Sequence, residues 1–185
     1  SQNGQNAINV WSTENLSNEP EIFGNNFAQT FYDVAWSNNG KFLAVSSLNG
    51  IIVVFNTNDK SILNSYQAHS SAARCVAFTK DDTCVVSAGD NGQIVIFNLK
   101  QNEPKQILSG HKGAVLSLQL SNDGKRIATS GVDRSIRVWS SNNGALLHTF
   151  HEHADKVWGV CWSADDRVLV SVGDDGNACW HDVSE

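Results

Sequence analysis

The chain has 185 residues, of which 41% are hydrophobic and 17% are charged, a balance typical of a globular protein with a sizeable core. Its formal net charge is −6 and its Lys and Arg residues are scattered. This disfavours direct binding to nucleic acid, because nucleic-acid binders usually carry a basic stripe. No apolar run is long enough for a membrane span, and the first residues lack the basic start and apolar block of a signal peptide.

Residues 1–24 hold two short apolar stretches, one ending at Trp11 and one formed by Ile22 and Phe23. They predict the third and outer strands of a partial sheet whose first half is absent.

From residue 25 onward the chain repeats every 42 residues, with an aromatic anchor in most copies and a histidine 28 residues before it. The anchor positions are Phe55, Phe97, Trp139 and His181, and the histidines of the last three repeats are His69, His111 and His153. Chance would not hold one register across three copies. Within each copy, short runs rich in β-branched and aromatic residues are bounded by Asn, Asp and Gly, which predicts strands and no helix.

The period divides the chain into units. We expect complete four-stranded units at residues 25–66, 67–108 and 109–150, and a last unit at residues 151–185 that lacks its outer strand.

The unit at residues 109–150 resembles one repeat of the WD-repeat family. Gly110-His111 opens it and Trp139 closes it, which is the signature of that family, although Trp139-Ser140 stands where Trp-Asp is usual. The resemblance implies an all-β WD-repeat β-propeller. The chain would supply four blades plus a partial one, as the C-terminal part of a seven-bladed propeller.

The two ends of the chain fit that expectation. Propellers usually close by building one blade from both chain ends, which removes the open edge. We therefore expect Glu185 to lie near the natural C-terminus and Ser1, which is not a Met, to be a truncation point. Two open edges would also allow the fragment to associate with a second copy.

In WD-repeat proteins a histidine, a hydroxyl residue, an acidic residue and the final Trp form a hydrogen-bonded chain inside each blade, and the offsets here match. The expected network residues are His69, Ser87 and Asn91 in the second complete unit, His111, Thr129, Asp133 and Trp139 in the third, and His153, Ser171 and Asp175, with His181, in the last. The first unit has Phe27, Val45 and Phe55 at these offsets, so we expect apolar packing there instead.

The narrow face of a propeller is made by the loops entering the first strands and by the turns between the second and third strands. The residues expected to form a partner-binding face there are Tyr32, Leu48, Arg74, Asp90, Lys156, Trp158 and Asp174. Trp158 stands out, because Trp, Tyr and Arg are the usual interface anchors and a rim position needs no indole for packing. With Asp90 and Asp174, the face is predicted to take an apolar side chain beside a basic one. The alternative is that Trp158 only covers the end of its blade.

Residues 147–150 (LHTF), 153–160 (HADKVWGV) and 170–175 (VSVGDD) look like the last blade of the WD-repeat subunits of Ski (superkiller) complexes. The resemblance implies a non-catalytic scaffold. Its partners would be a tetratricopeptide-repeat protein and a helicase that feeds RNA to the cytoplasmic exosome. In animals such subunits also join the Paf transcription complex, so a cytoplasmic location, with a nuclear one besides, is implied.

Catalytic and metal chemistry are disfavoured. The three repeated histidines fall in different blades and cannot converge on one ion, and no nucleophile motif or Gly-rich phosphate loop is present. Neither a metal nor a cofactor is expected. The four cysteines form no C-x-x-C pair, which favours reduced thiols in an intracellular compartment. The alternative function is a histone-tail or modified-peptide reader, for which only Tyr32 and Trp158 are candidate cage residues.

Overall fold

The computed structural model describes residues 6–14, 18–27, 29–101 and 103–184. These residues form seventeen strands and no helix, arranged in five antiparallel sheets. The all-β prediction is therefore confirmed.

Three sheets have four strands each, connected in simple up-and-down order. We call them the first, second and third blades. The first blade contains β3 (Phe31–Trp36), β4 (Phe42–Ser47), β5 (Ile51–Asn56) and β6 (Ile62–Gln67). The second contains β7 (Ala73–Phe78), β8 (Cys84–Gly89), β9 (Gln93–Asn98) and β10 (Pro104–Ser109). The third contains β11 (Val115–Leu120), β12 (Arg126–Gly131), β13 (Ile136–Ser140) and β14 (Leu146–Phe150).

Two smaller sheets flank these blades. The fourth blade has three strands, β15 (Val157–Trp162), β16 (Val168–Gly173) and β17 (Ala178–Asp182). The sheet at the other end pairs β1 (Asn6–Val10) with β2 (Glu21–Phe27). The boundary expected after residue 24 therefore falls inside β2, which continues to Phe27.

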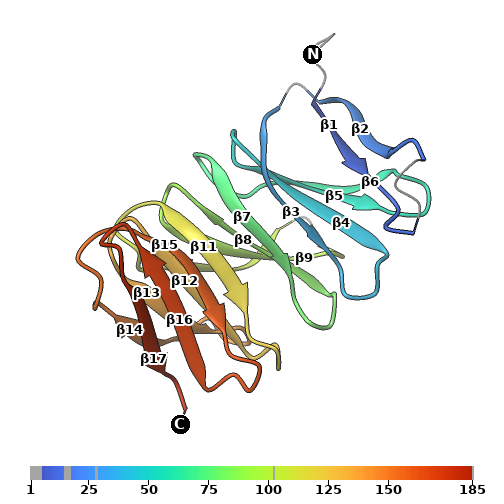
Figure 1. Cartoon of the computed structure of the whole chain (residues 1–185). Coiled ribbons are helices and arrows are strands. Elements are labelled where there is room, and N and C mark those ends of the chain that lie inside the picture. The colour runs from blue at the N-terminus through green and yellow to red at the C-terminus, as the bar shows by residue number, and fades with distance from the viewer. Residues whose placement is uncertain (1–5, 15–17, 28, 102, 185) are drawn as a thin grey trace.

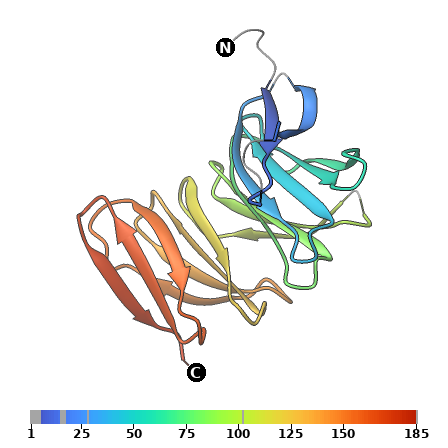
Figure 2. The same cartoon turned by 45° about the vertical axis from the view of Figure 1, so that its right-hand side comes forward.

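The sheets are fanned about a common axis, as Figures 1 and 2 show from two sides. The first strands of successive blades are neighbours, because β3 contacts β7, β7 contacts β11, and β11 contacts β15. This arrangement of radial four-stranded sheets is that of a β-propeller.

The core lies between the blades. Residues on one face of each sheet pack against the first three strands of the next sheet, so that every boundary holds its own apolar cluster. Between the first and second blades, for example, Ile52, Val54 and Tyr66 pack with Val76 and Phe78. Successive side chains of a strand point to opposite faces of its sheet, so one strand can contribute side chains to the apolar clusters on both sides of its blade.

Glycine at the turn between the second and third strands lets neighbouring blades approach closely. Gly50 has a φ of 81°, and a Cβ there would lie 2.1 Å from the carbonyl oxygen of His69. Gly92 repeats the arrangement with a φ of 76° and a distance of 2.8 Å to the carbonyl oxygen of His111. The loop that carries each histidine thus packs directly on the turn of the preceding blade, which a side chain would prevent.

The first blade has no polar network at the repeat offsets. Val45 and Phe55 are each 1% exposed and pack with Phe23 of β2, whose ring meets that of Phe55 edge-on at 6.0 Å. Apolar packing replaces the hydrogen bonds, as the sequence predicts. The side chain of Phe27 lies outside the described residues.

Some apolar repeat positions are exposed. Val34 and Trp36 on β3 are 51% and 48% exposed, and Trp180 on β17 is 71% exposed, although the equivalent positions in the middle blades are buried or, at Leu120, partly buried. No described strand lies against these faces. Burial at a repeat position therefore depends on the neighbouring blade and not on the residue alone.

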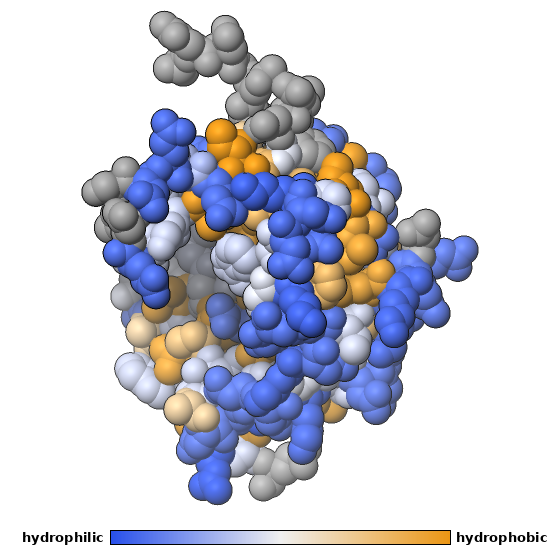
Figure 3. Space-filling model, turned by 90° about the vertical axis from the view of Figure 1, so that its right-hand side faces the viewer, coloured by the Kyte–Doolittle hydropathy of each residue, from blue (hydrophilic) through white to orange (hydrophobic). Residues whose placement is uncertain are grey.

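The outer strands present their sides to solvent. Figure 3 looks at the side of the molecule that carries β1, β2 and β6, where apolar patches interrupt a mostly hydrophilic surface. Ile22 on β2 and Ile62 and Leu63 on β6 are exposed. Lys60 and Glu21 form an ion pair of 3.3 Å between the same two parts of the chain. Charges beside an exposed outer strand oppose edge-to-edge pairing with other chains.

Candidate functional site

The third blade holds a complete polar network. His111 Nδ1 lies 3.0 and 3.1 Å from the two carboxylate oxygens of Asp133, and His111 Nε2 lies 2.9 Å from Thr129 Oγ1. The indole N–H of Trp139 donates to the same hydroxyl oxygen at 2.9 Å. With the Nδ1–H of His111 donating to the Asp133 carboxylate, its Nε2 accepts from the Thr129 hydroxyl, which in turn accepts from Trp139. Four separate stretches are thereby tied into one blade.

Asp133 is the charged end of this network. Burial by itself would raise its pKa, but hydrogen bonds from His111 and from the backbone N–H of Lys112 outweigh burial and lower the pKa well below its ordinary value. Asp133 also accepts from the hydroxyl of Ser135 at 2.8 Å. The carboxylate stays ionised and holds the loop before β11 against the turn after β12.

The second blade has a weaker version of the network. His69 Nδ1 lies 3.0 Å from the amide oxygen of Asn91, and His69 Nε2 lies 2.9 Å from Ser87 Oγ. The anchor Phe97 offers no donor, so the chain of hydrogen bonds ends at Ser87. The geometry brings together all three residues that the sequence places in this network.

The fourth blade has a network with two imidazoles. His153 Nδ1 lies 3.0 Å from both carboxylate oxygens of Asp175, and Ser171 Oγ lies 2.8 Å from His153 Nε2 and 2.7 Å from His181 Nε2. Hydrogen bonds from His153 and from the backbone N–H of Ala154 lower the pKa of Asp175. The order Asp–His–Ser is also that of a hydrolase triad. Ser171, however, is 1% exposed and its hydroxyl is shared between two rings, so no substrate reaches it.

His181 replaces an anchor Trp together with a second change that the sequence interpretation missed. In the third blade a Cβ on Gly110 would lie 2.9 Å from the Trp139 ring, so the large indole requires glycine there. The equivalent of Gly110 in the fourth blade is Glu152, whose carboxylate oxygen lies 3.4 Å from His181 Nδ1. The fourth blade thus combines a smaller ring at the anchor position, His181, with a larger residue, Glu152, at the position that Gly110 occupies in the third blade. Comparing residues 29 positions before each anchor would have revealed the pair.

Acidification should destabilise the chain in two steps. Burial lowers the pKa of His181, opposed by Glu152, and burial lowers the pKa of His69, opposed by Asn91. Both rings stay neutral in the folded chain, whereas in the unfolded chain they take up protons once the pH falls below their ordinary pKa of 6.5. The free energy of unfolding therefore keeps its full value above pH 6.5 and falls below that pH, by at most about 1.4 kcal/mol per pH unit for each ring. The lowered pKa values of Asp133 and Asp175 add a second loss as the pH falls through and below 3.8.

The first step can be measured by urea unfolding at about pH 7.5 and about pH 5.5. His181→Phe, which uses the anchor residue of the first two blades, should lose less stability between these pH values than the native chain. His151→Gln, at an exposed histidine, is the matched control and should keep the native loss. An equal loss in His181→Phe and the native chain would contradict the assignment.

The narrow face has a repeated frame. The backbone N–H of Leu48, Asp90, Val132 and Asp174 each donates to a carbonyl in the loop before the first strand of its own blade. In each blade, this frame brings the donating turn residue close to the second residue of the first strand, which lies two positions after the accepting carbonyl. The resulting pairs are Tyr32 and Leu48, Arg74 and Asp90, Leu116 and Val132, and Trp158 and Asp174.

Trp158 is exposed but fixed. It is 51% exposed, and its indole N–H donates to the carboxylate of Asp174. Lys156 lies 3.7 Å from the same carboxylate and 5.9 Å from the centre of the Trp158 ring. An aromatic side chain, a cation and a carboxylate therefore form one cluster at the rim of the fourth blade.

A second cluster of the same composition joins the first and second blades. Arg74 binds the carboxylate of Asp90, with one contact of 3.1 Å, and its guanidinium lies 5.2 Å from the centre of the Tyr32 ring. Tyr32 and its neighbour Leu48 are 45% and 50% exposed. Each aspartate on this face already has its own cation. A basic side chain of a partner would therefore have to share these carboxylates with Arg74 and Lys156.

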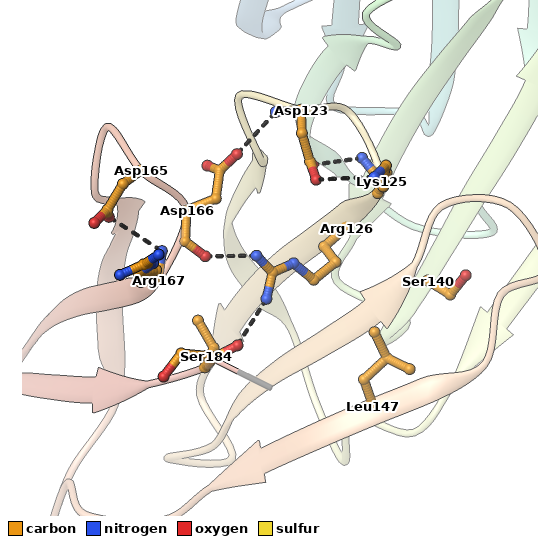
Figure 4. A pocket seen from close by; sticks show the side chains of 10 residues that line it. Asp123, Lys125, Arg126, Ser140, Leu147, Asp165, Asp166, Arg167 and Ser184 are labelled. Atoms are coloured by element: carbon orange, nitrogen blue, oxygen red, sulfur yellow. Dashed lines mark hydrogen bonds and ion pairs between the residues drawn. The ribbon is translucent and has the colours of Figure 1, made fainter.

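A polar groove lies on the opposite, wide face between the third and fourth blades, with a volume of about 710 Å³. Figure 4 shows Arg126 in it, bound to the backbone carbonyl oxygens of Asp166 and Val183. Its guanidinium also lies 4.7 Å from the centre of the Trp162 ring. Arg126 is thus occupied in joining two blades, and the mixed charges around it favour no ligand of one sign.

Among the residues that the structure describes, no three His, Cys, Asp or Glu side chains lie together so that they could hold a metal ion. The same residues include no helix long and apolar enough to cross a membrane.

Comparison with known proteins identifies the repeats. The model of the WD domain, G-beta repeat, matches residues 102–140 and 144–182, and the model of the anaphase-promoting complex subunit 4 WD40 domain matches residues 5–81. A chain in the crystal structure of the mitotic checkpoint complex superposes with a TM-score of 0.83, covering 91% of this chain and 54% of that one at 22% identity. At that identity the similarity shows the fold alone.

Several curated WD-repeat proteins are similar over different lengths. Meiotic fizzy-related protein 1 of Schizosaccharomyces pombe is 26% identical over 140 residues, which is 76% of this chain and 33% of the relative. Superkiller complex protein 8 of Dictyostelium discoideum is 40% identical over 60 residues, which is 32% of this chain and 20% of the relative. COMPASS component SWD3 of Saccharomyces cerevisiae is 27% identical over 139 residues, 74% of this chain and 43% of the relative.

The chain thus spans less than half of the length of these relatives. The matched repeats and the radial sheets agree along nearly all of it. The chain is a WD-repeat protein whose described residues form consecutive blades of a β-propeller.

Proposed function

We propose that the chain acts as a non-catalytic protein-interaction scaffold and that its narrow face receives the partner. The observation that carries the proposal is Trp158, which is half exposed and yet held by Asp174 and Lys156. A side chain that is already ordered loses little conformational freedom when a partner binds, so more of the contact energy appears as affinity. Trp is also the residue type most enriched among binding hot spots.

The partner should meet an apolar and charge-balanced surface. Tyr32, Leu48 and Trp158 are exposed, whereas Asp90 and Asp174 are paired with cations of the same face. Breaking those ion pairs to bind a basic ligand would cost part of the energy gained. We therefore infer that the partner offers a short segment with an apolar or aromatic anchor.

We further propose that the assembly is of the Superkiller type. The support is the 40% identity to Superkiller complex protein 8 over 60 residues, together with the resemblance of residues 153–160 and 170–175 to the last blade of such subunits. The partners would then be a tetratricopeptide-repeat protein and a helicase in cytoplasmic mRNA decay, with the Paf transcription complex as a second, nuclear setting. We propose no direct contact between the chain and nucleic acid.

Affinity capture of the tagged natural protein from cell extract tests this assignment. Recovery of a tetratricopeptide-repeat protein with a helicase supports the Superkiller-type assembly. Recovery of a different stable complex would refute that assembly but keep the scaffold role. If no protein is retained, the scaffold role itself is refuted.

The alternative of a modified-peptide reader is not favoured by the geometry. Arg74 lies over Tyr32 and Lys156 lies near the Trp158 ring, so each candidate cage residue already has a cation of this chain beside it. Recognition of a methylated lysine requires several free aromatic faces around one cation.

A further inference from the structure

The wide face carries a repeated carboxylate contact between blades. Asp82, in the turn after β7, accepts hydrogen bonds from the backbone N–H groups of Asn38 and Asn39 at 2.7 and 2.8 Å, and from the side-chain amide of Asn38 at 2.8 Å. The Asn38 amide also donates to the carbonyl of Thr79 at 3.1 Å. We call this contact a latch, because it joins the turn of the first blade to that of the second.

The same latch recurs 84 residues later, between the third and fourth blades. Asp166 accepts from the backbone N–H groups of Asn122 and Asp123, each at 2.8 Å, and from the side-chain amide of Asn122 at 2.8 Å. The Asn122 amide also donates to the carbonyl of Ser163 at 3.0 Å. All four bonds of the first latch are reproduced. Both aspartates have a left-handed backbone, with φ of 56° for Asp82 and 59° for Asp166.

The boundary between the second and third blades has no latch. Gly124, with a φ of 77°, occupies the position of the aspartate, and Lys80 occupies the position of the asparagine. Lys80 Nζ instead donates to the carbonyl of Asn122. Among the described residues, no carboxylate accepts from the backbone N–H groups of Lys80 and Asp81. The apolar cluster nearer the first strands remains, with Val115 and Leu118 packed on the second blade.

A second contact alternates in the same way. The hydroxyls of Thr57 and Ser141 donate to the carbonyls of Gly40 and Gly124, at 2.8 and 2.7 Å, within the first and third blades. The equivalent residues of the second and fourth blades are Leu99 and Val183, which have no hydroxyl. The structural repeat at the wide face is therefore two blades long, although the sequence signature repeats every blade.

We propose that the blades are latched in pairs, and that the boundary between the second and third blades is the one at which the wide face opens first. A carboxylate that accepts three N–H bonds makes charge-assisted contacts, which are about twice as strong as neutral ones. The two latched boundaries gain these contacts in addition to apolar packing. At the unlatched boundary the apolar cluster acts as a hinge, and the turns at the wide face separate about it.

Amide hydrogen exchange of the native chain gives the first test, since it needs no variant. The backbone N–H groups of Asn38, Asn39, Asn122 and Asp123 should exchange at least about tenfold more slowly than those of Lys80 and Asp81, because opening of a latch must precede exchange. Equal protection at the three turns would overturn the proposal.

The second test moves a latch to the unlatched boundary with the double substitution Lys80→Asn and Gly124→Asp. The proposal expects slow exchange at positions 80 and 81 and a melting temperature about 2–4 °C above that of Gly124→Asp alone, which carries the same strain of a Cβ placed 2.8 Å from Lys80 Cβ. Gly40→Asp is the control for an aspartate at positive φ without a latch, because a Cβ on Gly40 has nothing within 4 Å and no described turn faces it. Slower exchange without a higher melting temperature would show that this boundary does not open first, and an equal gain in Gly40→Asp would exclude a latch as the cause.

Discussion

Replacing Asp133 by Ala should lower the free energy of unfolding by about 3–5 kcal/mol, the usual cost of removing one partner from a buried charged contact. The Asp133 side chain is 8% exposed and accepts from His111, Ser135 and the backbone N–H of Lys112. Without it, three donors lose their acceptor where water has little access. The imidazole of His111 is buried, and only the Ser135 hydroxyl, 3.3 Å away, would remain near its Nδ1–H, so the loss of this bond makes the largest contribution.

Asp133→Asn provides the matched variant, because the second blade already uses an amide at this position. His69 meets the amide oxygen of Asn91 at 3.0 Å, which shows that an asparagine can accept from the histidine in this fold. We therefore expect Asp133→Asn to cost less than half as much as Asp133→Ala in urea unfolding. If both variants unfold like the native chain, the network contributes no stability to the blade.

The blade interior could be predicted because its contacts recur at constant spacing. One period in the sequence predicts the places of His69, His111 and His153, and each meets its expected hydroxyl residue at 2.8–2.9 Å. Contacts within one repeat unit can be predicted from the sequence, since the same positions pack against each other in every copy.

Relations between units were harder to predict. The latches use Asn38 with Asp82 and Asn122 with Asp166, so their partners belong to different repeats and alternate with a period of two. Aligning single repeats hides that alternation. The exposure of Trp180 has the same origin, because a strand residue is buried only if another blade lies against it.

The charge balance of the narrow face does not follow from the sequence pattern. The sequence predicts that Asp90 and Asp174 help this face take a basic side chain beside an apolar one, and the structure adds that Arg74 and Lys156 already pair with these carboxylates. Side-chain reach decides this outcome. A long cationic side chain on the same rim, although 16 or 18 positions away in the sequence, can fold back onto a carboxylate, and the sequence does not show whether it does.

Replacing Trp158 by Ala should weaken binding of the captured partner about thirtyfold or more, because truncating a hot-spot residue costs about 2 kcal/mol or more. The melting temperature should stay within about 1–2 °C of the native value, since surface substitutions usually change stability by less than about 0.5 kcal/mol. Trp158 is 51% exposed. Its contacts to Asp174 and Lys156 lie at the rim, outside the apolar clusters between the blades.

Two further variants separate contact from orientation. Leu146→Ala removes a side chain of similar exposure, 46%, from the outer strand β14 and should leave affinity unchanged. Trp158→Phe keeps an aromatic ring but loses the N–H that Asp174 accepts, so the ring gains freedom and the affinity should fall between those of the native chain and Trp158→Ala. Titration calorimetry with the purified partner measures all three. Native affinity in Trp158→Ala would move the binding site away from the fourth blade, because among its described residues no other exposed indole lies on the narrow face to anchor a partner.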